Sequence, residues 1–140
     1  MNKLFIFGTL KEGFPNFEKN GGTRIRGEFR TAEMYPLYLV GERYSPWLID
    51  TPGKGNYIRG QLFEASAETL KKMDRLERIE AIDGYRRKTI QIQKIGSDTR
   101  LITAFAYLKP ESQLTNAETK LGPIVSYEKH HAELYQARSL

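Results

Sequence analysis

The stretch from Leu4 to Gly13, LFIFGTLKEG, constrains the fold of this chain more than any other. Four consecutive apolar residues are typical of a short strand buried on both faces, and Gly8 ends the run. The small residues Gly8 and Thr9 then predict a tight loop, because glycine lets the backbone approach a neighbour closely. Backbone N–H groups exposed by such a loop can bind an anion or a polarised carbonyl. We therefore expect a binding loop at the end of the first strand.

Length and composition exclude several classes of protein. The 140 residues are expected to form one domain over 1–140. The absence of cysteine excludes disulfides, thiolate metal sites and cysteine nucleophiles. The net charge of +5 is spread along the sequence, which predicts a solvated surface. The apolar run after Lys3 is too short for a secretory signal, and no run suits a transmembrane helix. We therefore expect a cytoplasmic protein that binds no membrane.

Short apolar or alternating segments predict six further strands. They lie at 24–33, 35–41, 45–49, 57–65, 85–95 and 101–108. Turns are expected at 52–56 and at 96–98, the second joining the last two strands. Gly60 lies inside the strand 57–65, where a glycine indicates a bulge or a close neighbour.

One helix is well marked, with Ser66 as its N-cap and its end at about Ile79. The segment 11–23 is expected to be a loop that holds one helical turn, 109–123 a loop, and 126–138 a terminal helix. Helices do not alternate regularly with strands, so a doubly wound sheet is not expected. We predict an α+β fold with a small mixed, strongly curved, barrel-like sheet and flanking helices.

Glu77 is the most informative side chain of the predicted helix. At about 100° per residue it lies on the same face as Leu70 and Met73. A carboxylate on an apolar face must be paired, hydrogen-bonded or protonated, and burial raises its pKa toward the range of a general acid or base. The alternative is a structural ion pair with an arginine. Glu80 is a rival for the catalytic role if the helix continues.

Other motifs of catalysis or binding are incomplete. Phe14 and Pro15 stand where a phosphate-binding P-loop needs Lys and Ser/Thr, and no Gly-x-Ser-x-Gly elbow is present. His130 and His131 are adjacent, so on a helix they diverge and cannot hold one metal ion together; both are expected on the surface. The basic run 86–88 alternates along a strand, which favours one inward partner for a carboxylate and two solvated charges over nucleic-acid binding.

Several motifs together resemble one family. Phe7-Gly8-Thr9-Leu10 is similar to the Tyr-Gly-Thr-Leu or Tyr-Gly-Ser-Leu signature that opens the gamma-glutamylcyclotransferase-like, or AIG2-like, proteins. The segments 35–37, 41–42, 46–48 and 52–55 resemble the gamma-glutamylamine cyclotransferase branch. The segments 73–77 and 85–87 resemble the family's Leu-Asp-x-x-Glu-Gly and Tyr-x-Arg elements. The resemblance covers about residues 3–108, and residues 110–140 match none of these motifs.

The resemblance implies a small β-barrel whose cavity lies over the Gly-Thr-Leu loop. It also implies cyclisation of a small gamma-glutamyl compound to 5-oxoproline with release of an amine, without a metal or cofactor. Glu77 would move protons between the α-ammonium group and the departing amine. Backbone N–H groups around Phe7, Gly8, Thr9 and Leu10 would hold the glutamyl portion and the developing oxyanion.

Three departures from the family pattern bear on the substrate. Phe7 replaces the usual Tyr, Arg78 replaces the Gly after the acid, and Gln61 stands where Glu is common. Gamma-glutamyl amino acids are therefore a rival substrate class. A noncatalytic pocket for a small carboxylate metabolite or a peptide end is the alternative from another functional class. The sequence predicts neither the leaving amine nor the oligomeric state.

Overall fold

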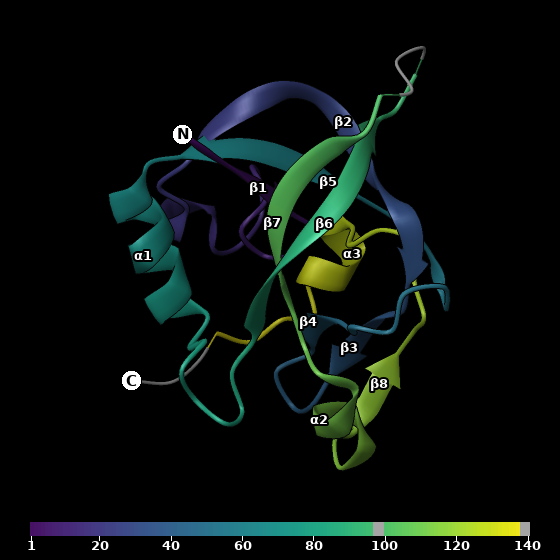
Figure 1. The fold of residues 1–140 in the computed structure, drawn as a ribbon. Coiled ribbons are helices and arrows are strands. Elements are labelled where there is room, and N and C mark those ends of the chain that lie inside the picture. The colour runs from purple at the N-terminus through teal and green to yellow at the C-terminus, as the bar shows by residue number, and fades with distance from the viewer. Residues whose placement is uncertain (97–99, 138–140) are drawn as a thin grey trace.

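Five strands close into a barrel in the computed structural model, which describes residues 1–96 and 100–137 (Figure 1). In order around the barrel they are β1 (Asn2–Ile6), β5 (Asn56–Ala65), β2 (Thr23–Tyr35), β6 (Arg86–Lys94) and β7 (Ile102–Leu108). The described pairs are antiparallel except β1 with β7, where Leu4 pairs with Phe105 in parallel and closes the ring. The expected mixed, strongly curved sheet is confirmed.

The barrel interior is filled by apolar side chains from all of its strands, including Phe5, Phe29, Leu62, Ile92 and Ala106. Burial of such side chains stabilises the fold by about 1.5–3 kcal/mol for each large residue. Gly60 is needed for this packing, because a Cβ there would lie 2.5 Å from the carbonyl oxygen of Ile6. The close neighbour that the sequence indicated is therefore the backbone of β1.

A second, three-stranded sheet lies at one end of the barrel (Figure 1). It has the order β4 (Ser45–Leu48), β3 (Leu37–Val40) and β8 (Thr119–Leu121), with α2 (Glu111–Thr115) beside it. The expectation of a loop over 109–123 is wrong, because this segment contains α2 and β8. The strand β8 is short and exposed, and only its pairing with β3 defines it, so no local pattern indicates it.

The helix α1 (Ala67–Leu76) packs its apolar face on the outside of the barrel. Ser66 caps it as expected, since the side-chain oxygen accepts the N–H of Thr69 over 3.1 Å. Leu70 and Met73 are buried against side chains of β1 and β5. The helix ends three residues before the predicted Ile79. The expected turn after Pro15 is η1 (Phe17–Lys19).

The C-terminal segment forms one helical turn, α3 (Lys129–Ala132), so the expected helix over 126–138 is wrong within the described residues; residue 138 lies outside them. The expected surface position of His131 is also wrong. Its ring is buried and stacks on Tyr127 with centroids 6.0 Å apart, and its Nδ1 accepts the N–H of Glu128 over 2.9 Å. A histidine folded back on the helix start cannot project into solvent.

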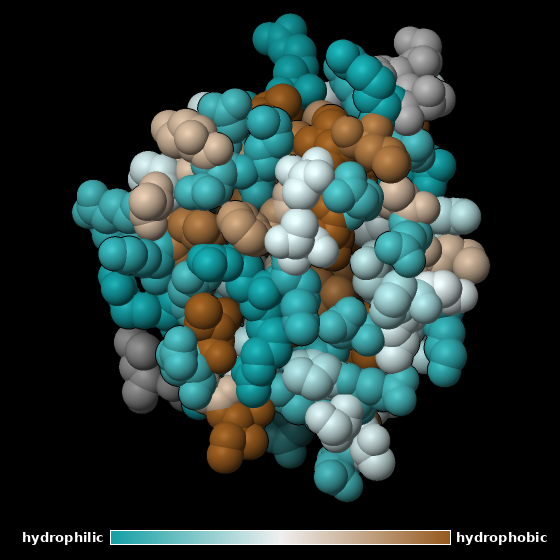
Figure 2. Space-filling model, in the orientation of Figure 1, coloured by the Kyte–Doolittle hydropathy of each residue, from teal (hydrophilic) through white to brown (hydrophobic). Residues whose placement is uncertain are grey.

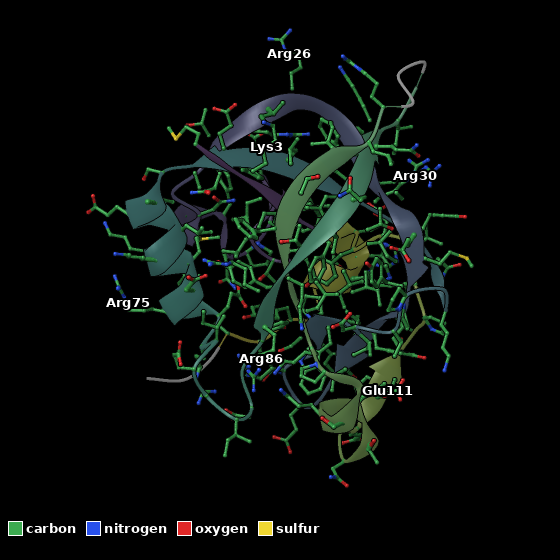
Figure 3. The ribbon with its side chains drawn as sticks, viewed as in Figure 1. Lys3, Arg26, Arg30, Arg75, Arg86 and Glu111 are labelled. Atoms are coloured by element: carbon green, nitrogen blue, oxygen red, sulfur yellow. The ribbon has the colours of Figure 1, made fainter. Side chains whose placement is uncertain are left out.

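Figure 2 shows hydrophilic residues interspersed with small apolar patches, and Figure 3 places Lys3, Arg26, Arg75 and Arg86 on separate elements. None of the described helices has both the length and the apolar character needed to cross a bilayer. The predicted turn at 96–98 falls largely on residues 97–99, which lie outside the described residues.

Candidate active site

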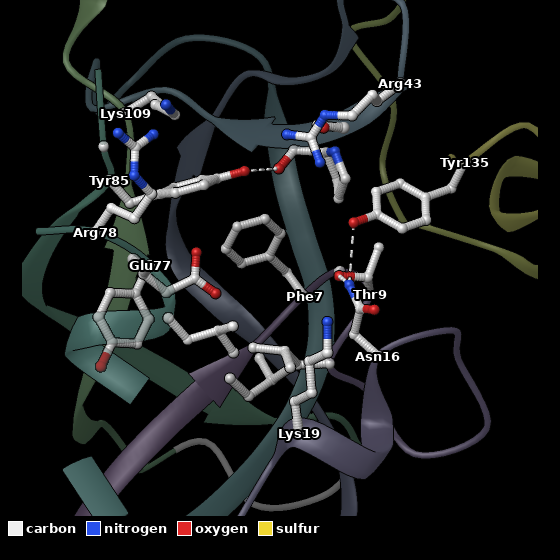
Figure 4. A pocket seen from close by; sticks show the side chains of 18 of the residues that line it. Phe7, Thr9, Asn16, Lys19, Arg43, Glu77, Arg78, Tyr85, Lys109 and Tyr135 are labelled. Carbon is white, nitrogen blue, oxygen red and sulfur yellow. Dashed lines mark hydrogen bonds between the residues drawn. The ribbon is translucent and has the colours of Figure 1, made fainter. Parts of the chain in front are cut away.

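A cavity of about 290 Å³ lies between the loop after β1, the end of α1 and the C-terminal segment (Figure 4). All five side chains or loop positions singled out from the sequence line it: Phe7, Gly8, Thr9, Leu10 and Glu77. The structure thus brings together two segments that are distant in the sequence. Their chemical roles remain predictions.

The loop after β1 is held in a fixed shape by its own backbone. The Lys11 N–H donates to the Gly8 carbonyl over 3.0 Å, and the Asn16 N–H donates to the Thr9 carbonyl over 2.8 Å. A Cβ on Gly8 would lie only 2.8 Å from Cγ of Pro46, so the loop packs where a larger residue would not fit. Among the described residues, no acceptor is found for the N–H groups of Gly8, Thr9 and Leu10, which leaves these donors available at the cavity wall.

Glu77 is positioned by the way in which α1 ends. The Arg78 N–H donates to the Arg75 carbonyl over 3.1 Å, and the Ile79 N–H donates to the Asp74 carbonyl over 3.2 Å. These two bonds form a Schellman motif, in which the residue after the C-cap adopts the left-handed conformation. Glu77 is the C-cap and Arg78 has φ of 55°. Glu77 therefore leaves the helix end with its carboxylate directed into the cavity (Figure 4).

Because α1 ends earlier than predicted, the two acidic candidates for the catalytic role, Glu77 and Glu80, lie in different surroundings. Glu77 keeps right-handed dihedral angles, with φ of −84° and ψ of 0°, so its side chain retains the direction that the periodicity predicted. Glu80 follows the reversal at Arg78, is exposed and does not line the cavity. Sequence periodicity missed the early end because glycine, not arginine, is the usual signal for this conformation.

The segment 78–85, which follows Glu77, is fixed by contacts at both ends. The Tyr85 N–H donates to the Glu77 carbonyl over 3.0 Å, and the Tyr85 hydroxyl donates to the Pro46 carbonyl over 2.9 Å. The Arg86 guanidinium donates to the carbonyls of Ala81 and Gly84 over 2.9 and 3.0 Å. The expectation that two residues of the run 86–88 are solvated charges is thus wrong for Arg86. Its donors are used inside the loop, a role that the alternation of the strand does not indicate.

The expected inward partner for a carboxylate is Arg87, whose Nη1 lies 2.6 Å from the carboxylate of Asp74. Asp74 also accepts the hydroxyl of Tyr107 over 2.7 Å. Burial, that hydrogen bond and the nearby charges of Asp74 and Glu77 raise the pKa of Tyr107 above its usual range. Tyr107 lines the cavity beside Glu77, and it stays a neutral hydrogen-bond donor at physiological pH.

Four cationic side chains also line the cavity, of which the sequence singled out only Arg78: Lys19, Arg43, Arg78 and Lys109. Lys109 is buried, and its Nζ donates to the Asp83 carbonyl over 2.6 Å and lies 4.2 Å from the centre of the Trp47 ring. Arg78 lies 3.0 Å from the carboxylate of Asp83, and this contact lowers the pKa of Asp83. Lys19, Arg43 and Lys109 lie in turns and at element ends, where no motif indicates them.

Tyr135 and Asn16 complete the cavity wall. Tyr135 reaches the wall from the C-terminal segment, and its hydroxyl oxygen accepts a hydrogen bond from Nδ2 of Asn16 over 3.1 Å (Figure 4). The same Nδ2 donates to the Thr9 hydroxyl over 3.0 Å, which ties the C-terminal segment to the binding loop. Within residues 1–96 and 100–137, no group of three or more His, Asp or Glu side chains is arranged to hold a metal ion.

Comparison with known proteins gives one consistent result. A family model described as "Gamma-glutamyl cyclotransferase, AIG2-like" matches residues 4–132, so the match continues past the motifs that end near residue 108. The gamma-glutamylaminecyclotransferase of Mus musculus is 35% identical over 98 residues, 66% of this chain. Gamma-glutamylaminecyclotransferase B of Danio rerio is 34% identical over 116 residues, 78% of this chain. These alignments span 64% and 60% of the two relatives' own lengths.

The fold has matches among solved structures. The crystal structure of an AIG2-like protein from Mus musculus matches with a TM-score of 0.81 and 28% identity, over 100% of this chain and 98% of that chain. A solved gamma-glutamyl cyclotransferase matches with a TM-score of 0.63 over 84% of this chain and 69% of that chain. At 14% identity, this second likeness shows the shared fold alone.

Proposed function

The chain belongs to the AIG2-like gamma-glutamyl cyclotransferase family, and we propose that it cyclises a gamma-glutamyl amine to 5-oxoproline and releases the amine. The observation that carries the proposal is the placement of Glu77 opposite the loop Gly8–Leu10 across one cavity. A proton acceptor and a set of backbone donors that face a common space are what an intramolecular attack on an amide requires.

The reaction needs proton transfers but no external nucleophile, because the substrate supplies its own. The α-amino nitrogen of the substrate attacks its own γ-carbonyl carbon, the bond from that carbon to the leaving nitrogen breaks, and the ring closes. The α-ammonium group loses two protons on the way to the lactam, and the leaving amide nitrogen gains two to depart as an ammonium ion. We assign both transfers to the Glu77 carboxylate, which faces the cavity from the end of α1.

The loop after β1 supplies the complementary electrostatic part. When the amine attacks, negative charge develops on the γ-carbonyl oxygen, and preorganised N–H donors stabilise it most where water is excluded. The N–H groups of Gly8, Thr9 and Leu10 are candidates for this role and for binding the glutamyl carboxylate. The remaining contribution is conformational, because holding the glutamyl chain folded brings the two reacting atoms together.

The choice of an amine as leaving group is supported by the relatives rather than by the site alone. The two curated relatives reported above are gamma-glutamylaminecyclotransferases, and the alignments cover less than two thirds of their length. Gamma-glutamyl amino acids remain the competing substrate class, which a panel of gamma-glutamyl compounds would separate.

The proposal is tested by incubating the protein with ε-(γ-glutamyl)lysine and quantifying 5-oxoproline and free lysine by mass spectrometry. We expect the two products in equal amounts, with multiple turnovers per protein molecule. Saturable binding of the compound by calorimetry without product after long incubation would contradict the proposal. That result would favour the noncatalytic pocket instead.

A further inference from the structure

The cavity that holds Glu77 continues into a second groove. Six residues line both spaces: Arg43, Ser45, Arg78, Asp83, Tyr85 and Lys109. The groove then runs along the turn between β3 and β4 and along α2. If the glutamyl portion lies between Glu77 and the loop after β1, this groove is the continuous space into which the leaving portion of a longer substrate can extend.

Arg43 is the cation at this junction for which the described residues supply no partner. Arg78 is paired with Asp83, and the ammonium group of Lys109 donates to the carbonyl of Asp83. In the described part of the chain, the Arg43 guanidinium makes no hydrogen bond, ion pair or ring contact. Figure 4 shows it directed into the cavity, across from Glu77.

The backbone around Arg43 is held by hydrogen bonds, although its side chain has no partner within residues 1–96 and 100–137. The Tyr44 N–H donates to the Gly41 carbonyl over 3.1 Å, which closes the turn, and the Arg43 carbonyl accepts the N–H of Gln136 over 3.0 Å. Gly41 and Tyr44 both have positive φ, 74° and 54°. A half-buried guanidinium on a fixed turn is prepared to bind an anion at small entropic cost.

We propose that Arg43 binds a carboxylate on the leaving portion of the substrate, so that the site prefers gamma-glutamyl compounds whose released amine carries a carboxylate. The guanidinium presents paired donors that match a carboxylate in bidentate geometry. This inference rests on the proposed function for the identity of the ligand. It goes further by naming the residue that discriminates between leaving groups.

Two compounds that differ only in this group provide the test. They are ε-(γ-glutamyl)lysine and N-(γ-glutamyl)-1,5-diaminopentane. The second compound lacks the carboxylate of the lysine portion and keeps that of the glutamyl portion. A charge-assisted hydrogen bond contributes enough to change a rate or binding constant by about tenfold or more. We expect wild-type kcat/KM to favour the lysine compound by about tenfold. In Arg43→Gln the ratio of the two kcat/KM values should fall to near one, and a circular dichroism spectrum like that of the wild type shows that the variant is folded.

Arg26→Gln is the matched control, because Arg26 is exposed on β2 away from both spaces and loses the same charge. It should keep the wild-type preference. A wild-type ratio near one, a ratio that survives Arg43→Gln, or an equal loss in Arg26→Gln would each overturn the inference.

A binding measurement separates this inference from the proposed function. Calorimetry with Glu77→Gln and with Glu77→Gln/Arg43→Gln compares the affinities for both compounds without turnover. We expect the lysine compound to bind about tenfold more tightly than the diaminopentane compound, and only in the protein that keeps Arg43. Equal affinities would overturn the inference. The expected affinities, together with no 5-oxoproline from the wild type, would overturn the proposed function and leave the Arg43 site standing.

Discussion

The backbones of Glu77 and Tyr85 are joined by a hydrogen bond, in which the Tyr85 N–H donates to the Glu77 carbonyl over 3.0 Å. Both side chains line the same cavity, so the intervening loop is closed on itself at the wall of the candidate active site. The position of the acid therefore depends on the loop 78–85, whose first residues donate hydrogen bonds to the last turn of α1.

Arg78→Gly is expected to be more stable than Arg78→Ala. Arg78 has φ of 55°, and the left-handed conformation costs a residue with a Cβ about 1 kcal/mol relative to glycine. Both substitutions remove the contact with Asp83, so their comparison isolates the backbone effect. Urea unfolding should give a free energy of unfolding about 1 kcal/mol higher for the glycine variant. Equal values would show that this conformation is not strained.

Gly84→Ala is expected to disrupt the loop that carries Glu77. A Cβ at this position would lie 1.8 Å from the Arg78 carbonyl oxygen, so the backbone must move. We expect the free energy of unfolding to fall by at least about 2 kcal/mol and turnover to fall with it. Gly21→Ala is the control, since the three atoms nearest to its Cβ would belong to the flexible Thr69 side chain, the first at 3.1 Å. Similar losses in both variants would contradict the steric explanation.

Gln61 is expected to support the loop after β1. Its buried Oε1 accepts the N–H of Glu12 over 2.7 Å. Gln61→Leu removes the acceptor and should lower the free energy of unfolding by about 1 kcal/mol and raise KM, because the loop loosens. Gln61→Glu restores a residue common in the family and keeps an acceptor, so its KM should stay near the wild-type value. A Leu variant with unchanged KM would show that this bond does not shape the loop.

Lys11 is expected to make the stability of the protein rise in alkaline solution. Its Nζ is buried and donates to the Tyr127 carbonyl over 2.6 Å, and burial lowers the pKa of Lys11 from 10.5 to about 8. Between pH 8 and 10.5 the unfolded chain then binds more protons than the folded chain at this site, so stability increases with pH there.

The measurement is urea unfolding of the wild type and Lys11→Met at pH 7.5 and pH 10. From one pH to the other, the wild type should gain about 2 kcal/mol relative to the variant, which has no titrating group at this position. A difference between the two proteins that does not change with pH would contradict the lowered pKa.

The sequence predicted β1 to β7 because each contains a continuous apolar run or an alternation of apolar and polar residues, and Gly60 correctly indicated a close approach of β1. The pairing of β8 with β3 depends on contacts between distant segments, which a local pattern does not record. The end of α1 was misplaced because Arg78 adopts a conformation that glycine usually signals. The binding loop was indicated by the glycine that follows the first apolar run, and Glu77 by its place on the apolar face of the helix, and the family motifs pointed to the same residues. Arg43 lies in a turn outside those motifs.

The role of Glu77 is tested by comparing Glu77→Gln with Glu80→Gln in an assay of 5-oxoproline formation from ε-(γ-glutamyl)lysine. Both variants replace one carboxylate by an amide, but Glu77 lines the cavity and Glu80 is exposed outside it. We expect kcat for Glu77→Gln to fall by about 10²–10⁴-fold with the fold intact by circular dichroism, and Glu80→Gln to match the wild type. A folded Glu77→Gln variant with wild-type turnover would contradict the assignment of Glu77 as the group that moves the protons.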